Sequence, residues 1–116
     1  MIVRVLHGRV KADSVSLFRE RSSLALARTR RHDGCCFAQV GRQVHKDGSE
    51  EIIFLSVWND LEAVYDWVGG MDLRNAPVIA GDVPEVFAYF DIQHYEVVDQ
   101  TVAGVPLAAA GYSHES

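Results

Sequence analysis

Residues 55–70, LSVWNDLEAVYDWVGG, decide the fold of this chain. An apolar strand pattern ends at Trp58, and Asn59 follows it as a helix-capping residue, with Glu62 in the capping-box position. Four residues then recur at helical spacing and predict the buried stripe of an amphipathic helix that Gly69-Gly70 ends: Leu61, Val64, Tyr65 and Val68. The stretch therefore predicts a strand-to-helix junction flanked by two tryptophans, Trp58 and Trp67.

Further strand patterns lie on both sides of this junction. Residues 2–9 alternate, and we expect Val3, Val5 and His7 on one face and Ile2, Arg4 and Leu6 on the other. Residues 36–44 and 51–58 form two more strands joined by the Asp47-Gly48 turn, and residues 87–98 form a fourth. Residues 51–58 are apolar on both faces, which predicts a central strand.

A first helix is predicted between the first two strands. Asp13 or Ser14 can cap it, and Gly34 can end it in a left-handed turn. Its inward face is predicted by residues at helical spacing: Val15, Phe18, Ser22, Ala25 and Thr29.

The resulting order β-α-β-β-α-β predicts an α+β, ferredoxin-like domain over residues 1–98, with a four-stranded antiparallel sheet and both helices on one face. The other face would be bare, and Ile2 and Leu6 on it would need a cover, so we expect a homodimer. Residues 71–86 read as irregular. Residues 99–116 form an Ala/Gly-rich tail that could reach the partner subunit.

Composition narrows the class of protein. The 116 residues make one domain, and a formal net charge of −5 argues against a nucleic-acid partner. No run of about 18 apolar residues exists to span a membrane, and the N-terminus does not read as a signal peptide. Cys35 and Cys36 are adjacent, which disfavours a disulfide and favours a cytoplasmic location.

The pattern of elements, with Leu55-Ser-Val-Trp58 and its following helix, resembles the antibiotic biosynthesis monooxygenase (ABM) family. The resemblance implies a dimeric α/β barrel in which two ferredoxin-like sheets pack face to face. Locally the chain is similar to the Isd-type haem-degrading monooxygenases, whose helix tryptophan Trp67 matches. Pro77 stands where those enzymes carry the histidine that ligates haem iron, and proline cannot ligate iron.

Two residues lead the candidate catalytic set. We expect His7 on the helix-covered face, where a neutral imidazole can act as a general base. Trp67 lies off the axis of the buried stripe, so we expect it at the edge of the helix–sheet contact, walling a cleft shared with His7. The alternative for both is a structural role in the core.

Other candidates follow from position and from the resemblance. The resemblance permits Asn59 and Trp58 to hold substrate and oxygen, although Asn59 also reads as a cap. Arg74 could hold a carboxylate or phenolate from a lid segment. Either His94 or Tyr95 could reach the shared cavity, and Tyr65 could contact ligand or pack in the core.

No metal-ligand spacing and no nucleotide-binding motif is present. The resemblance to the ABM family implies a monooxygenase, and we expect it to oxygenate a small electron-rich aromatic, such as a phenol or hydroquinone, without metal or flavin. One alternative is a haem-binding or haem-degrading protein, and another is a non-catalytic module that binds a small apolar or aromatic ligand.

Overall fold

The computed structural model describes residues 1–69, 84–98, 101–102 and 105–106. The elements in chain order are β1 (Ile2–Val10), a 3-10 turn (Ala12–Ser14), α1 (Val15–Arg30), β2 (Cys35–Val44), β3 (Glu50–Trp58), α2 (Leu61–Val68), a second 3-10 turn (Pro84–Val86) and β4 (Phe87–Glu96). Two short strands, β5 (Thr101–Val102) and β6 (Val105–Pro106), pair with each other in the tail.

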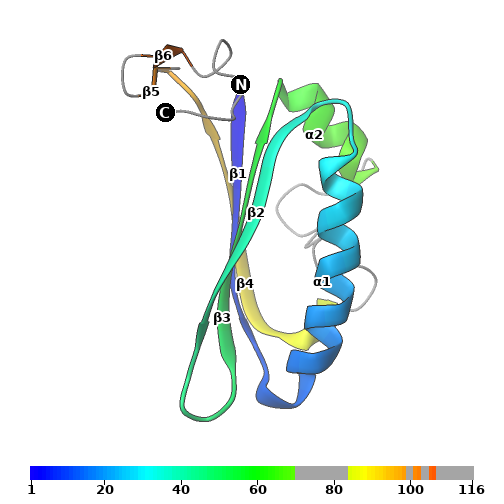
Figure 1. Cartoon of the computed structure of the whole chain (residues 1–116), viewed down its shortest axis with the longest axis vertical. Coiled ribbons are helices and arrows are strands. Elements are labelled where there is room, and N and C mark those ends of the chain that lie inside the picture. The colour runs from blue at the N-terminus through cyan, green and yellow to red at the C-terminus, as the bar shows by residue number, and fades with distance from the viewer. Residues whose placement is uncertain (70–83, 99–100, 103–104, 107–116) are drawn as a thin grey trace.

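The four long strands form one antiparallel sheet in the order β2-β3-β1-β4, and α1 and α2 lie on the same side of it (Figure 1). This is the predicted ferredoxin-like α+β fold, and β3 is central as its two apolar faces predicted. The predicted turn between β2 and β3 is also confirmed, with Gly48 at a φ of 88°. The face of the sheet away from the helices is called the open face below.

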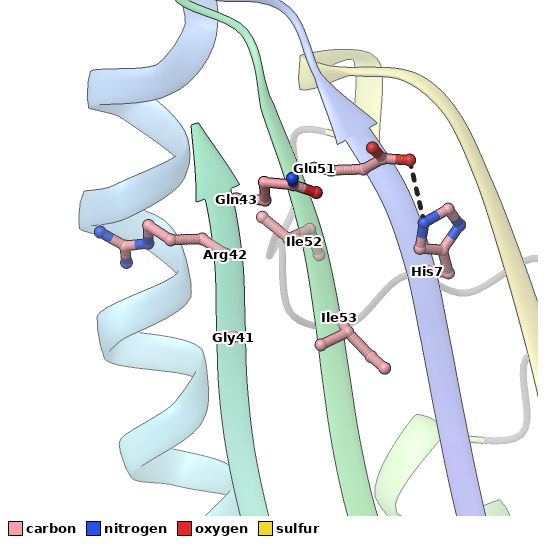
Figure 2. Close-up of a pocket in the computed structure, with 7 residues that line it drawn as sticks. All are labelled: His7, Gly41, Arg42, Gln43, Glu51, Ile52 and Ile53. Carbon is pink, nitrogen blue, oxygen red and sulfur yellow. Dashed lines mark ion pairs between the residues drawn. The ribbon is translucent and has the colours of Figure 1, made fainter. Parts of the chain in front are cut away.

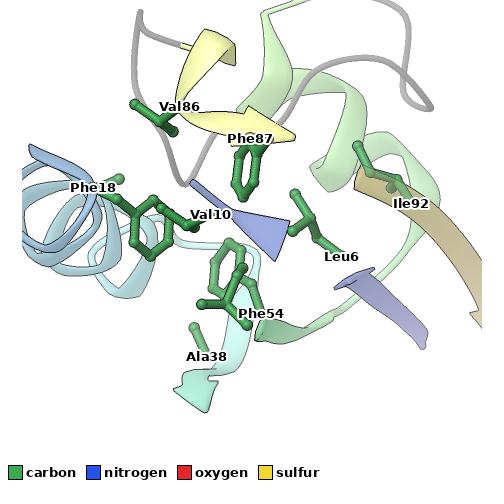
Figure 3. Packing of buried hydrophobic residues seen from close by; sticks show 10 residues of the cluster. Leu6, Val10, Phe18, Ala38, Phe54, Val86, Phe87 and Ile92 are labelled. Carbon is green, nitrogen blue, oxygen red and sulfur yellow. The ribbon is translucent and has the colours of Figure 1, made fainter. Parts of the chain in front are cut away.

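The core lies between the sheet and the helices. Phe18 of α1 meets Phe87 edge to face at 5.6 Å, over Leu6, Val10 and Phe54 of the sheet (Figure 3). Four of the five predicted inward residues of α1 are buried: Phe18, Ser22, Ala25 and Thr29. The buried hydroxyl of Thr29 donates to the Ala25 carbonyl at 2.8 Å, so its polar group is satisfied within the helix.

The faces of β1 are the reverse of the prediction. Arg4, Leu6 and Val10 are buried beneath the helices, whereas His7 is exposed on the open face. The alternation over residues 2–9 carries apolar groups on both faces, so it could not decide which face the helices cover. Val10 shows which face the helices cover, because it is buried and lies on the same face of β1 as Leu6, two positions further along that face.

The ends of the helices correct two further expectations. Asp60, not Asn59, caps α2, because its carboxylate accepts from the backbone N–H of Ala63 at 2.8 Å. Gly69 ends α2 at a φ of 72°, as predicted. Gly34 has no positive φ, and Arg31 caps the end of α1 in right-handed geometry. A Cβ on Gly34 would lie 2.4 Å from the Cβ of Ala63, so Gly34 allows a close approach to α2.

The buried stripe of α2 is narrower than predicted. Val64 and Val68 are buried and Trp67 is half-buried, whereas Leu61 and Tyr65 are 41% and 49% exposed. The eight-residue helix meets the sheet along one i, i+3, i+4 row, which leaves the side of Leu61 and Tyr65 in solvent.

Arg74 and Pro77, and most of the tail 99–116, lie outside the described residues. No helix among the described residues is long and apolar enough to cross a membrane.

Candidate active site

Two tryptophans meet at the end of β3, where α2 folds back over the sheet. Their ring centroids are 4.8 Å apart, and Trp67 also lies 6.3 Å from the ring of Phe54. Trp58 is fully buried, and its indole N–H donates to the Ser56 hydroxyl at 2.9 Å. Trp67 lies at the edge of the helix–sheet contact, as its place on the helix predicted.

A buried arginine lies against this aromatic pair. The guanidinium carbon of Arg4 is 5.0 Å from the centroid of the Trp67 ring, which is cation–π geometry. Only 1% of Arg4 is exposed, and burial lowers its pKa to about 10, so the group remains a cation at neutral pH. A positive charge is therefore held on the helix-facing side of the sheet.

His94 is the hydrogen-bond partner of this cation. Arg4 and His94 are register partners on β1 and β4, and Nη1 of Arg4 lies 3.2 Å from Nε2 of His94. A guanidinium has donors but no acceptor, so Nε2 accepts and the ring carries its proton on Nδ1. His94 is then a neutral imidazole beside a cation, a group able to accept a proton.

A second histidine supports the aromatic pair from outside. Nδ1 of His32 accepts from the backbone N–H of Gly34 at 3.0 Å, and Nε2 lies 2.8 Å from a carboxylate oxygen of Asp66. The ring meets Trp58 edge to face at 5.4 Å. Both ring nitrogens are occupied, so His32 ties α2 to the start of β2.

The remaining predicted residues do not join this cluster. Asn59 accepts a hydrogen bond from the thiol of Cys36 at 3.1 Å, and its backbone N–H donates to Gly34. Burial raises the pKa of the Cys36 thiol, so it is no activated nucleophile. Asn59 instead lines an acidic hollow of about 440 Å³, together with His32, Asp33, Gly34, Asp60, Glu62, Ala63 and Asp66.

His7 lies on the opposite side of the sheet from Trp67. Its Nε2 is 3.1 Å from Glu51 on the open face, at a hollow of about 410 Å³ whose other lining residues are Gly41, Arg42, Gln43, Ile52 and Ile53 (Figure 2). The predicted cavity shared by His7 and Trp67 is therefore wrong, because the face assigned to His7 was reversed. Among the described residues, no group of three or more His, Cys, Asp or Glu could hold a metal ion.

Sequence analysis missed Arg4, the most deeply buried charge of the cluster. The sequence did carry a signal of this burial, because Arg4 lies on the same face of β1 as Leu6 and Val10. A charged residue in a buried phase requires compensating partners and is a marker of function.

The fold is a ferredoxin-like α+β domain with two helices on one face of its sheet. An aromatic and cationic cluster lies beneath the second helix. The sequence pattern of the family "Antibiotic biosynthesis monooxygenase" matches residues 1–76. The chain therefore belongs to the antibiotic biosynthesis monooxygenase family. No curated protein matches its sequence significantly.

Solved structures share the fold at low sequence identity. A candidate antibiotic biosynthesis monooxygenase from Deinococcus radiodurans has a TM-score of 0.68 and 16% identity, covering 88% of this chain and 97% of that one. A second, from Nitrosomonas europaea, has a TM-score of 0.68 and 13% identity, covering 84% and 99%. A variant of MhuD with two manganese protoporphyrin IX molecules bound per active site has a TM-score of 0.61 and 20% identity, covering 89% and 100%.

Proposed function

We propose that the protein is a monooxygenase that oxygenates a small phenol or hydroquinone without metal or flavin, at the cluster of Arg4, Trp58, Trp67 and His94. The observation that carries the proposal is the buried Arg4 cation, held between the Trp67 ring and a neutral imidazole. Membership of the family supports the reaction class, and the chemistry of these side chains supports an aromatic substrate that can become an anion.

The first step is removal of a phenolic proton. Nε2 of His94 accepts from Arg4, so a phenolic hydroxyl can donate to Nε2 once the Arg4 guanidinium turns from Nε2 to the phenolic oxygen. As the proton moves to His94, the guanidinium donates to the phenolate oxygen instead. The negative charge thus develops beside a buried cation, where electrostatic stabilisation is strong.

The later steps use the electrons of the substrate. The phenolate reduces O₂, a carbon–oxygen bond forms on the ring, and the O–O bond then breaks. For a simple phenol the products are one quinone and one water, so one atom of O₂ enters the product and the other leaves as water. Half-buried Trp67 supplies a flat apolar surface for the ring, and fully buried Trp58 packs behind it.

The test is oxygen uptake with a panel of hydroquinones and phenols, corrected for autoxidation without protein. The proposal expects protein-dependent uptake of one O₂ per substrate, with one ¹⁸O atom from ¹⁸O₂ in the product. Saturable binding of the same compounds without turnover would favour the non-catalytic ligand-binding alternative. Neither binding nor turnover across the panel would reject the aromatic substrate class.

Haem binding is the second candidate, because a variant of MhuD with manganese protoporphyrin IX bound shares the fold. The two histidines beside the aromatic pair do not suit axial ligation of iron. Both nitrogens of His32 are occupied, and Nε2 of His94 could ligate only if Arg4 left it. We therefore expect no saturable Soret shift on titration with hemin; a one-per-subunit shift lost in His94→Ala would promote the haem candidate.

A homodimer closed through the open face is part of the proposal. Ile53, Tyr89 and Tyr95 are 45%, 49% and 55% exposed on this face, beside half-buried Val3 and Val5. Leu6, which sequence analysis placed there, is instead in the core. An apolar sheet face of this kind is rarely left in solvent, and a second copy supplies a matching surface.

The two free cysteines, Cys35 and Cys36, support the proposed cytoplasmic location.

A further inference from the structure

Helix α2 has little core packing to hold it in place. It has eight residues, and two of them, Val64 and Val68, are buried. A helix this short is not stable by itself, so its position depends on its contacts with the rest of the chain. Because α2 carries Trp67, the place of the Trp67 ring over Arg4 depends on the same contacts.

The turn between α1 and β2 supplies two such contacts. A Cβ on Gly34 would lie 2.4 Å from that of Ala63, so the backbone of the turn passes directly against α2. Two residues earlier, Nε2 of His32 lies 2.8 Å from a carboxylate oxygen of Asp66. Ala63, Asp66 and Trp67 are spaced i, i+3, i+4 and are therefore neighbours on the helix surface. The turn thus contacts α2 next to Trp67 itself.

The hydrogen bonds of His32 fix the orientation of its ring. Nδ1 accepts from the backbone N–H of Gly34 at 3.0 Å, so Nδ1 carries no proton. The ring proton is then on Nε2, which donates it to Asp66. In this orientation the ring meets Trp58 edge to face at 5.4 Å. The side chain of His32 is therefore held at both nitrogens and along its edge.

His32 reaches the proposed active site by two routes. Its ring packs against Trp58, whose ring centroid is 4.8 Å from that of Trp67. Its hydrogen bond holds Asp66, the residue that precedes Trp67 on α2. Both routes end at the ring that lies over Arg4, the cation proposed to stabilise the phenolate.

We propose that the hydrogen bond between His32 and Asp66 positions Trp67, and that His32 is a positioning residue of the active site. The bond holds α2 where the Trp67 ring covers the Arg4 guanidinium and can present its surface to an aromatic substrate. The effect on substrate binding rests on the proposed function. The effect on the position of the ring does not.

Asp66 allows the hydrogen bond to be removed without disturbing the core. Its side chain is 76% exposed, and Asp66→Ala places a better helix former in α2. Asp66→Asn loses the same charge but keeps a side-chain oxygen that can accept from Nε2 of His32. Glu62→Ala removes another exposed carboxylate of the same helix. Together these variants separate the hydrogen bond from the charge and from helix stability.

The first measurement is near-ultraviolet circular dichroism, which needs no substrate. Two indoles whose centroids are 4.8 Å apart interact electronically, so the tryptophan bands depend on their mutual orientation. We expect Asp66→Ala to change these bands, whereas Asp66→Asn and Glu62→Ala should match the wild type. An unchanged spectrum in Asp66→Ala, or an equal change in Asp66→Asn, would overturn the inference.

The second measurement is oxygen uptake with the best substrate found. A displaced Trp67 ring weakens the binding of substrate and transition state alike, so KM should rise up to about tenfold in Asp66→Ala while kcat stays within about twofold. An unchanged KM in Asp66→Ala would reject the role in substrate binding, whatever kcat does. If the wild type turned over no substrate, the proposed function would fall, and the spectra alone would decide whether the hydrogen bond positions Trp67.

Discussion

Arg4 is a charged side chain at a buried position, where a folded domain tolerates few charges. Arg4 is buried in the middle of β1, where an unsatisfied cation would cost several kcal/mol. The Trp67 ring and the neutral His94 imidazole offset part of that cost. In the proposed reaction, the same buried cation would stabilise a phenolate.

A prediction at this scale concerns the cap of α2. Asp60→Ala removes the acceptor for the Ala63 N–H and should lower the free energy of unfolding by about 1 kcal/mol. Asn59→Ala loses only a contact with the exposed Cys36 thiol and should cost less than half as much. Urea denaturation of both variants measures the difference. Equal losses would place the cap at Asn59, as the sequence pattern suggested.

Gly34, just before β2, lies close to α2. Gly34→Ala would bring a methyl group to 2.4 Å from Ala63, so α2 must shift away from the sheet. We expect a loss of about 1–3 kcal/mol of stability and altered tryptophan fluorescence, because Trp67 moves with α2. In an Ala63→Gly background, which by itself costs about 1 kcal/mol, the added Gly34→Ala should cost far less.

The double-mutant cycle supplies the check on this contact. A coupling energy of about 1 kcal/mol or more between the two positions is expected for residues in direct contact. Strictly additive losses would show that the two backbones are not in contact at these positions.

The elements and their order could be predicted from the sequence, whereas the assignment of faces could not. Helical spacing in residues 15–29 and the Asp47-Gly48 turn each had one physical interpretation. Strand β1 had two interpretations, because both of its faces carry apolar residues: Val3 and Val5 on one, Leu6 and Val10 on the other. Only packing against α1 decides which face the helices cover. That single reversal moved His7 out of the candidate site and concealed Arg4.

At the scale of the whole molecule, we propose separate roles for the two faces of the sheet. The helix-facing side carries the aromatic and cationic cluster, and the open face carries the proposed dimer contact. We predict a dimer at micromolar concentration and pH 8, with roughly 2,000 Å² or more buried in total. Sedimentation velocity measures this, and Ile53→Asp should shift the protein toward monomer. A wild-type monomer under these conditions would contradict the prediction.

The central claim is that chemistry occurs on the helix-facing side, at His94 and Arg4. The most direct measurement compares oxygen uptake at pH 8 by His94→Gln with that by His45→Gln, using the best substrate found. Glutamine can still accept from Arg4 but cannot take a proton, so His94→Gln should fold normally and lose about 10²–10⁴-fold in turnover. His45→Gln, on the open face, should match the wild type. Full activity in His94→Gln would contradict the account.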